Sequence, residues 1–297
     1  MSIKVNNESF LLNKIKDYFI LFKLRLSLFV VFSACTAFII SSYDVNIHRL
    51  LVLSLGGFLI TASSNTFNQV LEVETDKLMT RTQNRPLPAG RMLVSEAVLV
   101  AGLTGLVGLI LLSLLSTMTA VLGAISLVSY SFIYTPMKKI SPAAVWIGAI
   151  PGALPMAIGS VAANDDGLGS LAIFLFSVQF LWQFPHFWAI AWLAYNDYAK
   201  ANFYLLPSSN RDGRTKSTVL QIIFYTLCLI SLSYVPFFVF DICGLYSCTI
   251  MLLMGLIVLF FGVKLYFSCN NQSAKMLMFS TLFYQLVVYI ALIIDKI

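Results

Sequence analysis

The sequence carries very little charge. Only 11% of its 297 residues are charged and 59% are hydrophobic, whereas a typical soluble domain is about a quarter charged and half apolar. This composition excludes an ordinary soluble domain and a disordered chain. Apolar stretches of about 20 residues, the length that crosses a bilayer, recur along the chain without a long polar insertion. They predict one polytopic integral membrane protein with the lipid bilayer as its surroundings.

Cysteines are few and odd in number, which argues against a disulfide framework. The five lie mostly within apolar segments and show no metal-binding spacing. The first eighteen residues lack both the apolar core of a secretory signal and the arginine-rich bias of a transit peptide. We therefore expect residues 1–18 to form a cytoplasmic tail and residues 19–297 to form a single membrane domain.

Nine apolar segments predict an all-α protein with nine transmembrane helices. They cover residues 19–41, 49–70, 96–116, 119–134, 143–162, 170–193, 218–240, 245–266 and 276–294. If the amino end lies inside, only Arg49 and Lys296 of the 19 basic residues fall on the outer face. This bias predicts a cytoplasmic N-terminus and an outside C-terminus. The longer, more specific loops fall on the cytoplasmic side, so we expect an integral protein of a bacterial inner (plasma) membrane with its active site facing the cytoplasm. The same bias also argues against a nucleic-acid partner, despite the net charge of +6.

The loop after the second segment carries an acidic stripe. Asn68, Glu72 and Asp76 are spaced i, i+4 and i+8, so in a helix they share one face. One amide and two carboxylates suit Mg²⁺, which completes its shell with water and phosphate oxygens. The alternative is a solvated helix end. The stripe predicts a metal site at the cytoplasmic surface.

Basic residues follow the acidic stripe and come again in a later loop. Arg81 and Arg85 continue the helical spacing until Pro86 ends the helix. Arginine forks match phosphate oxygens, so these residues predict contacts to a metal-bridged diphosphate; the alternative is membrane anchoring. In the loop after the fourth segment, Lys138 is the favoured phosphate contact and Lys139 the anchor.

The sixth segment contains an ionisable residue at membrane depth. His186 lies among aromatic residues, and Asp197 follows near the cytoplasmic surface. A buried ionisable side chain in a span is by default a functional hypothesis. A neutral histidine hydrogen-bonded to a neighbouring helix is the structural alternative, and both stay open here.

These pieces together resemble the intramembrane prenyltransferases. The matching motifs are Asn68-x₃-Glu72-x₃-Asp76, the stretch from Arg81 to Arg91, Tyr134-Thr135-Pro136-x-Lys138, the segment from Gly148 to Gly159, and Trp182-Gln183-Phe184-Pro185-His186-Phe187-Trp188 with Asp197-Tyr198. The last is similar to the haem-prenylating branch, the haem O synthases. The resemblance starts near residue 19, and in the last three spans it is one of hydropathy only.

The chain departs from that family pattern at three places. Glu72 stands where the family usually has aspartate, and Lys23-Leu24-Arg25 lacks the usual central proline. Only Asp197 stands where relatives that prenylate quinone precursors carry a second aspartate cluster. This last departure puts a second metal site in doubt.

The resemblance implies farnesyl diphosphate and haem B as substrates and haem O as the product, which serves respiratory oxidases. It implies Mg²⁺ held by Asn68, Glu72 and Asp76, with Arg81, Arg85 and Lys138 on the phosphates. Haem contacts are expected from His186, Trp182, Gln183 and Asp197. Downstream haem-handling or oxidase assembly proteins are expected partners. The alternatives are a prenyltransferase with a quinone-type aromatic acceptor and a secondary transporter.

Overall fold

The computed structural model describes residues 7–164, 167–207, 213–238 and 243–295. Within these ranges, nine helical segments are long and apolar enough to cross a membrane, which confirms the predicted all-α class and spans with ends shifted by a few residues. Five are α2 (Leu24–Ser41), α3 (Ile47–Leu71), α5 (Val94–Ser113), α8 (Ala144–Asn164) and α9 (Ser170–Leu193). The last two are α13 (Leu245–Ser268) and α14 (Asn271–Ile294).

The two remaining spans are each built from three consecutive pieces. Thr117–Met137 combines α6 (Thr117–Val128), the π-helix η1 (Ser129–Tyr134) and α7 (Thr135–Met137). Lys216–Phe238 combines α11 (Lys216–Ser231), the 3₁₀-helix η2 (Leu232–Tyr234) and α12 (Val235–Phe238). Three further helices lie outside the spans: α1 (Asn7–Leu21), α4 (Val73–Leu78) and α10 (Tyr195–Lys200).

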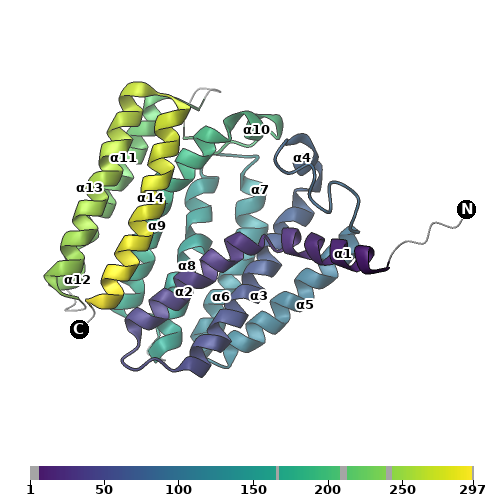
Figure 1. Cartoon of the computed structure of the whole chain (residues 1–297), viewed down its shortest axis with the longest axis horizontal. Helices are drawn as coiled ribbons and strands as arrows, with labels where there is room; N and C mark the ends of the chain where they lie inside the picture. Colours follow the sequence, from purple (N-terminus) through teal and green to yellow (C-terminus); the bar gives the residue numbers. More distant parts are fainter. Residues whose placement is uncertain (1–6, 165–166, 208–212, 239–242, 296–297) are drawn as a thin grey trace, which may run out of the picture.

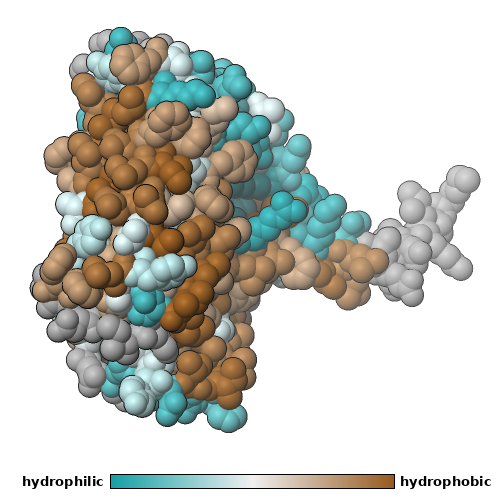
Figure 2. All heavy atoms as spheres, turned by 60° about the vertical axis from the view of Figure 1, so that its left-hand side comes forward, coloured by the Kyte–Doolittle hydropathy of each residue, from teal (hydrophilic) through white to brown (hydrophobic). Residues whose placement is uncertain are grey.

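The spans stand side by side, with α8 in the middle of the bundle (Figure 1). One flank contains α9, α11, α13 and α14, and the other contains α2, α3, α5 and α6. Large apolar side chains remain exposed on the outer helices, including Leu253, Phe260 and Phe283, and Figure 2 shows hydrophobic residues over much of the turned face. Such exposure suits contact with lipid. The helices α4 and α10 lie together at one end of the bundle.

Small residues in α8 allow its neighbours to approach closely. A β-carbon at Gly159 would overlap the carbonyl oxygen of Ala34 in α2, and one at Gly152 would overlap the side-chain oxygen of Gln183 in α9. Close backbone approach at small residues is a main source of helix association in membranes. The glycines therefore let α8 join the two flanks of the bundle.

The residues expected to form a tail are helical from Asn7 onward, whereas residues 1–6 lie outside the described part. The carboxylate of Asp17 accepts hydrogen bonds from Arg91 Nε at 3.1 Å and from its Nη2 at 2.9 Å, which ties α1 to the loop before α5. Lys23 separates α1 from α2 with a left-handed backbone, φ 47°. The first span therefore begins at Leu24 rather than at residue 19. Lys296, one of the two outer basic residues, is also outside the described residues.

We expect Gly159→Val to lower the free energy of unfolding by about 1–3 kcal/mol, the usual cost of overpacking. The new side chain would meet the backbone of Ala34 in α2. A lower midpoint of thermal unfolding in detergent measures this loss of stability. Gly102→Ala is the matched control, since nothing lies within 4 Å of a β-carbon at Gly102. Equal midpoints for the two variants would contradict the packing role of Gly159.

Candidate active site

The acidic stripe lies at the junction of α3 and α4. Asn68 is in the last turn of α3, Glu72 joins the two helices and Asp76 is in α4. The backbone amide of Glu72 donates to the Asn68 carbonyl at 3.0 Å, and that of Asp76 donates to the Glu72 carbonyl at 2.7 Å. The i, i+4 spacing thus continues across the junction. All three residues are buried, with relative exposures of 1%, 4% and 0%.

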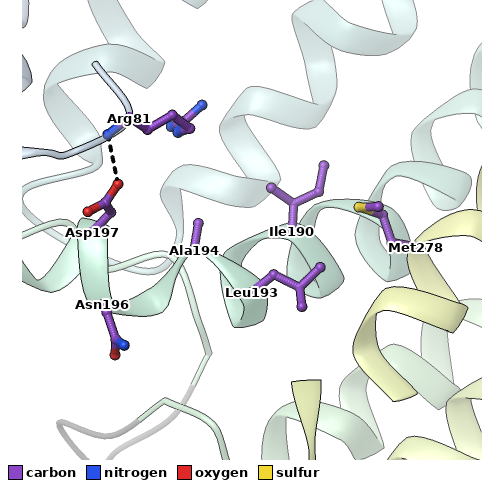
Figure 3. Close-up of a pocket in the computed structure, with 7 residues that line it drawn as sticks. All are labelled: Arg81, Ile190, Leu193, Ala194, Asn196, Asp197 and Met278. Carbon is purple, nitrogen blue, oxygen red and sulfur yellow. Dashed lines mark hydrogen bonds between the residues drawn. The ribbon is translucent and has the colours of Figure 1, made fainter. Parts of the chain in front are cut away.

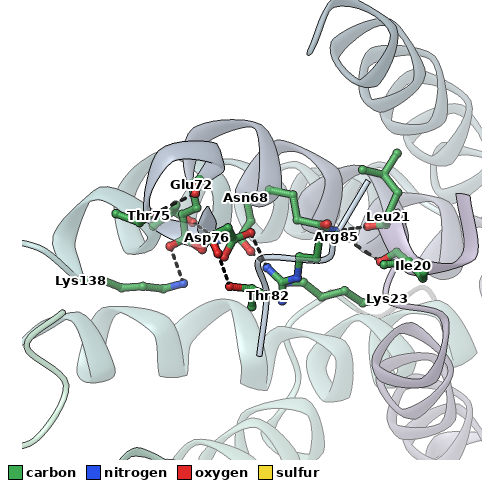
Figure 4. A network of polar contacts seen from close by, with 12 residues as sticks. Ile20, Leu21, Lys23, Asn68, Glu72, Thr75, Asp76, Thr82, Arg85 and Lys138 are labelled. Carbon is green, nitrogen blue, oxygen red and sulfur yellow. Dashed lines mark hydrogen bonds and ion pairs between the residues drawn. The ribbon is translucent and has the colours of Figure 1, made fainter. Parts of the chain in front are cut away.

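Three cationic side chains from separate segments contact the stripe (Figure 4). Lys138 Nζ lies 2.9 Å from Glu72 Oε1, and Arg85 Nη1 lies 2.7 Å from Asp76 Oδ2. Lys23 Nζ donates to Asn68 Oδ1 at 2.7 Å. Three groups that can carry positive charge therefore surround two carboxylates. An added anion would favour the charged form of all three groups.

Lys138 and Glu72 stabilise each other's charged form. Burial acts to raise the pKa of Glu72, but the charge and hydrogen bond of Lys138, together with Lys23 and Asn68, lower that pKa below its usual range. Burial acts to lower the pKa of Lys138, but the charge of Glu72, together with Tyr130, raises that pKa above its usual range. Removing one partner of a buried ion pair leaves an uncompensated charge, which costs about 3–5 kcal/mol. Lys139, in contrast, is exposed.

Lys23 is a site residue that the sequence reasoning missed. Burial, followed by the charges of Arg85 and Lys138, lowers the pKa of its ammonium group to about 7. The signal in the sequence was the Lys23-Leu24-Arg25 motif at the start of the first span, which matched the family pattern except for the proline. The break between α1 and α2 brings this lysine to Asn68.

Thr135, the first residue of α7, fixes the orientation of Asn68. Thr135 Oγ1 donates its one proton to the carbonyl of Tyr130 at 2.9 Å. It must therefore accept from Asn68 Nδ2, which lies at 3.1 Å. The amide oxygen of Asn68 consequently faces Lys23. In this position it can accept a hydrogen bond or coordinate a cation.

The predicted helical continuation to Arg81 and Arg85 is wrong. Helix α4 ends at Leu78, and residues 79–92 form turns. Thr82 Oγ1 donates to the carbonyl of Asp76 at 2.9 Å, and such side-chain bonds compete with the helix for backbone acceptors. The turns bring Arg85 back to Asp76, as expected for a site contact.

Arg81 lies elsewhere. Its backbone amide donates to Asp197 Oδ2 at 3.1 Å, and its guanidinium carbon is 5.8 Å from the ring centroid of Tyr198. Asp197 also accepts from the backbone amide of Thr80 at 3.2 Å. Burial acts to raise the pKa of Asp197, but hydrogen bonds from Lys200, Arg81 and Thr80 have the larger combined effect. The pKa of Asp197 is therefore below its usual value. Asp197 therefore joins the loop after α4 to α10.

His186 and Trp182 face α14. His186 Nδ1 lies 2.9 Å from Thr281 Oγ1, and that hydroxyl donates to the Met278 carbonyl at 2.6 Å. His186 Nδ1 must therefore carry the proton, which leaves the lone pair on Nε2. Trp182 stacks on His186 at 4.7 Å and donates from Nε1 to the Thr281 carbonyl at 2.6 Å. These contacts match the structural alternative and leave one imidazole nitrogen available.

Gln183 connects α9 to α8 rather than to the acidic stripe. Its Nε2 donates to the carbonyl of Ala149 at 3.0 Å and to that of Gln179 at 3.2 Å. The four expected haem contacts thus divide between membrane depth, where Trp182, Gln183 and His186 lie, and the surface, where Asp197 lies. The structure does not gather them into one cluster with the stripe.

The stripe fits a divalent metal that is shared with a substrate. No group of three or more His, Cys, Asp or Glu residues suited to a metal occurs in the described ranges, so the protein builds no complete cage there. Asp76 Oδ1 is buried without a hydrogen-bond partner, and an unpaired buried oxygen is costly. Mg²⁺ typically takes one or two carboxylates and fills its shell with water and phosphate oxygens. Asn68, Glu72 and Asp76 supply that kind of donor set.

Comparisons with known proteins agree with this geometry. Residues 28–287 match the model of the UbiA prenyltransferase family. A protein from Cytophaga hutchinsonii named protoheme IX farnesyltransferase is 43% identical, with 96% of this chain and 99% of that protein covered. One of the same name from Flavobacterium psychrophilum is 40% identical, with 92% of each covered.

Solved structures share the fold at low sequence identity. A digeranylgeranylglyceryl phosphate synthase has a TM-score of 0.79 at 19% identity, covering 95% of this chain and 98% of that one. A UbiA homolog from Archaeoglobus fulgidus, bound to GPP and Mg²⁺, has a TM-score of 0.68 at 14% identity, covering 93% and 99%. At these identities the likeness establishes the fold.

Inorganic pyrophosphate with Mg²⁺ should raise the thermal midpoint of the protein. The anion would interact with Lys23, Arg85 and Lys138, and the metal ion would interact with the unpaired Asp76 oxygen. At a ligand concentration 100-fold above Kd the stabilisation is about 2.7 kcal/mol. Asp76→Asn should lose most of this shift. Glu74→Gln should keep it, since the Glu74 side chain is 80% exposed and pairs with Lys77. Loss of the shift in both variants, or in neither, would argue against the stripe as the binding site.

Proposed function

The chain belongs to the UbiA prenyltransferase family, and we propose that it transfers the farnesyl group of farnesyl diphosphate to a vinyl group of haem B, giving haem O. The observation that carries the diphosphate half of this proposal is the buried stripe of Asn68, Glu72 and Asp76 under three cations. Support for haem as the acceptor comes from the relatives at 43% and 40% identity that are named for that reaction.

The proposed reaction breaks the bond between C1 of the farnesyl group and the diphosphate oxygen. Both electrons leave with the diphosphate, and an allylic cation remains. The π electrons of the haem vinyl group then form the new carbon–carbon bond. Water adds to the resulting haem-side cation and loses a proton, which gives the hydroxyethylfarnesyl substituent and balances the reaction.

The chain's own cations stabilise the departing diphosphate in this proposal. Preorganised positive groups aimed at developing negative charge supply a large part of catalysis in water-poor sites. Lys138 and Arg85 are held by Glu72 and Asp76 before substrate arrives, and Lys23 is held by Asn68. When bound, Mg²⁺ would neutralise further phosphate charge beside the stripe.

Aromatic rings flank the cationic groups. Lys138 Nζ lies 4.6 Å from the ring centroid of Tyr134 and 5.6 Å from that of Phe203. Their faces lend electron density to a nearby cation and reduce the access of water. Early capture of the allylic cation by water would give farnesol instead of haem O, so this shielding favours transfer.

The site faces the cytoplasm of a bacterial inner membrane in this proposal, because the basic loops gather at the end of the bundle that holds the stripe. The product would then pass to haem-handling or oxidase assembly proteins. His186 would contact haem, with its Nε2 lone pair directed to the iron, and Trp182 and Gln183 would hold that helix face in place. Asp197 would act at the surface by holding the loop that contains Arg81.

Purified protein incubated with haem B, farnesyl diphosphate and Mg²⁺ should release a haem that is heavier by one farnesyl group and a hydroxyl, as measured by mass spectrometry. Lys138→Met should lower kcat at least about 100-fold, the usual loss on removing one charge-stabilising group. The kcat of Lys139→Met should stay within about threefold of wild type, because this exposed lysine does not contact the stripe and stabilises no charge there. Prenylation of a quinone-type aromatic acceptor in place of haem, or transport without any product, would overturn the proposal.

His186→Ala should weaken haem binding about tenfold, the effect of losing one metal-ligand or strong polar contact, as followed by the Soret absorption during titration. Thr281→Val should weaken it less, because the imidazole remains but its Nδ1 proton loses the partner that orients it. The thermal midpoint without haem separates this from misfolding. Unchanged haem affinity in a folded His186→Ala protein would assign the residue to helix packing alone.

A further inference from the structure

A pocket of about 390 Å³ opens beside the cytoplasmic ends of α9 and α14. Figure 3 shows its polar residues at one end and its apolar residues along the other. It is lined by Arg81, Ile190, Leu193, Ala194, Asn196, Asp197 and Met278. The lining does not include Asn68, Glu72 or Asp76, but it contains residues of the loop after α4 and of the helix α10, which lie together at the end of the bundle that holds the acidic stripe.

The polar end of the pocket is net positive. Arg81 has no ion-pair partner among the described residues. Asp197 is the one carboxylate in the lining, and its oxygens accept from Thr80, Arg81 and Lys200, which reduces its hold on an added cation. Lys200 Nζ lies 3.2 Å from Asp197 Oδ1 and brings a second positive charge to this end of the pocket. Anionic groups are therefore favoured at this end.

The apolar end of the pocket includes Ile190 of α9, and His186 lies before it on the same helix, outside the lining. Ile190 lies four residues after His186, so the two side chains share one face of the helix a turn apart. Met278 lies on the opposite wall, and its carbonyl accepts the hydroxyl proton of Thr281, the partner of His186. A flat apolar ligand in this pocket would thus lie on Ile190 and Met278, with the Arg81 guanidinium at its polar edge.

We propose that this pocket is the acceptor subsite, and that Arg81 binds a carboxylate of the acceptor rather than the diphosphate. The inference rests on the proposed function, because haem B combines a flat apolar macrocycle with two carboxylates on one edge. Its macrocycle would lie against Ile190, Leu193 and Met278, with the carboxylates toward Arg81 and Lys200. Asp197 is then a positioning residue, since it holds the backbone of Arg81.

Haem B and haem dimethyl ester, whose carboxylates are blocked, provide the test. The purified full-length protein and Arg81→Gln are titrated with each haem by Soret absorption, and the KM of farnesyl diphosphate is measured separately. Loss of one charge-assisted contact should weaken haem B binding by Arg81→Gln about tenfold. The wild type should bind the ester more weakly than haem B by a similar factor. Arg81→Gln should not weaken binding of the ester any further, as expected when both changes remove the same interaction.

Ala194→Trp supplies a second, independent variant because it fills the pocket without changing its charge. We expect its haem KM to rise at least about tenfold, in line with the loss of one well-packed contact region, and its KM for farnesyl diphosphate to stay within twofold of wild type, a change of about 0.4 kcal/mol. Ala89→Trp, at an exposed loop position, is the control and should leave both constants near those of wild type.

Three outcomes overturn the subsite. They are equal weakening of haem B and its ester by Arg81→Gln, a rise in the KM of farnesyl diphosphate instead of haem, and unchanged haem affinity in Ala194→Trp. If the wild type farnesylates haem while any of these holds, the subsite fails and the proposed function stands. If the wild type neither binds nor farnesylates haem, both fail.

Discussion

Everything at the candidate active site depends on burying two carboxylates without losing their charge. Glu72 and Asp76 are almost fully removed from solvent, and an isolated buried charge costs several kcal/mol. Each is therefore paired with a cation from another part of the chain, Lys138 and Arg85. The same pairing forces the ends of α3, α7 and the 79–92 turns together. The two ion pairs thus connect three segments that are distant in the sequence.

Part of this site could be predicted from the sequence because it is local. The i, i+4 spacing of Asn68, Glu72 and Asp76 survives the change from α3 to α4, since the backbone hydrogen bonds continue across it. The nine spans follow from hydropathy alone. The position of Lys138 next to the stripe was favoured over Lys139, but only tertiary structure separates a buried lysine from an exposed neighbour.

The rest could not be predicted because it depends on turns and on distant contacts. Helical spacing suggested that Arg81 and Arg85 act alike, whereas α4 ends at Leu78 and the turns that follow bring Arg85 to Asp76 and Arg81 to Tyr198. Lys23 reaches Asn68 only because its left-handed backbone breaks the helix before α2. The hydroxyl of Thr281, on the last span, determines which nitrogen of His186 is protonated, and no local pattern near His186 indicates it.

The contacts that Asp197 makes between the loop after α4 and α10 are weaker than the ion pairs of the acidic stripe. The contacts of Asp197 to Thr80 and Arg81 are exposed, and exposed polar pairs contribute only about 0–1 kcal/mol, far less than the buried pairs beneath them. A separation of the loops at this end of the bundle would therefore begin at the contacts of Asp197. A ligand could then leave sideways while Glu72 and Asp76 keep their cationic partners, so the charged centre would not have to form again in every cycle.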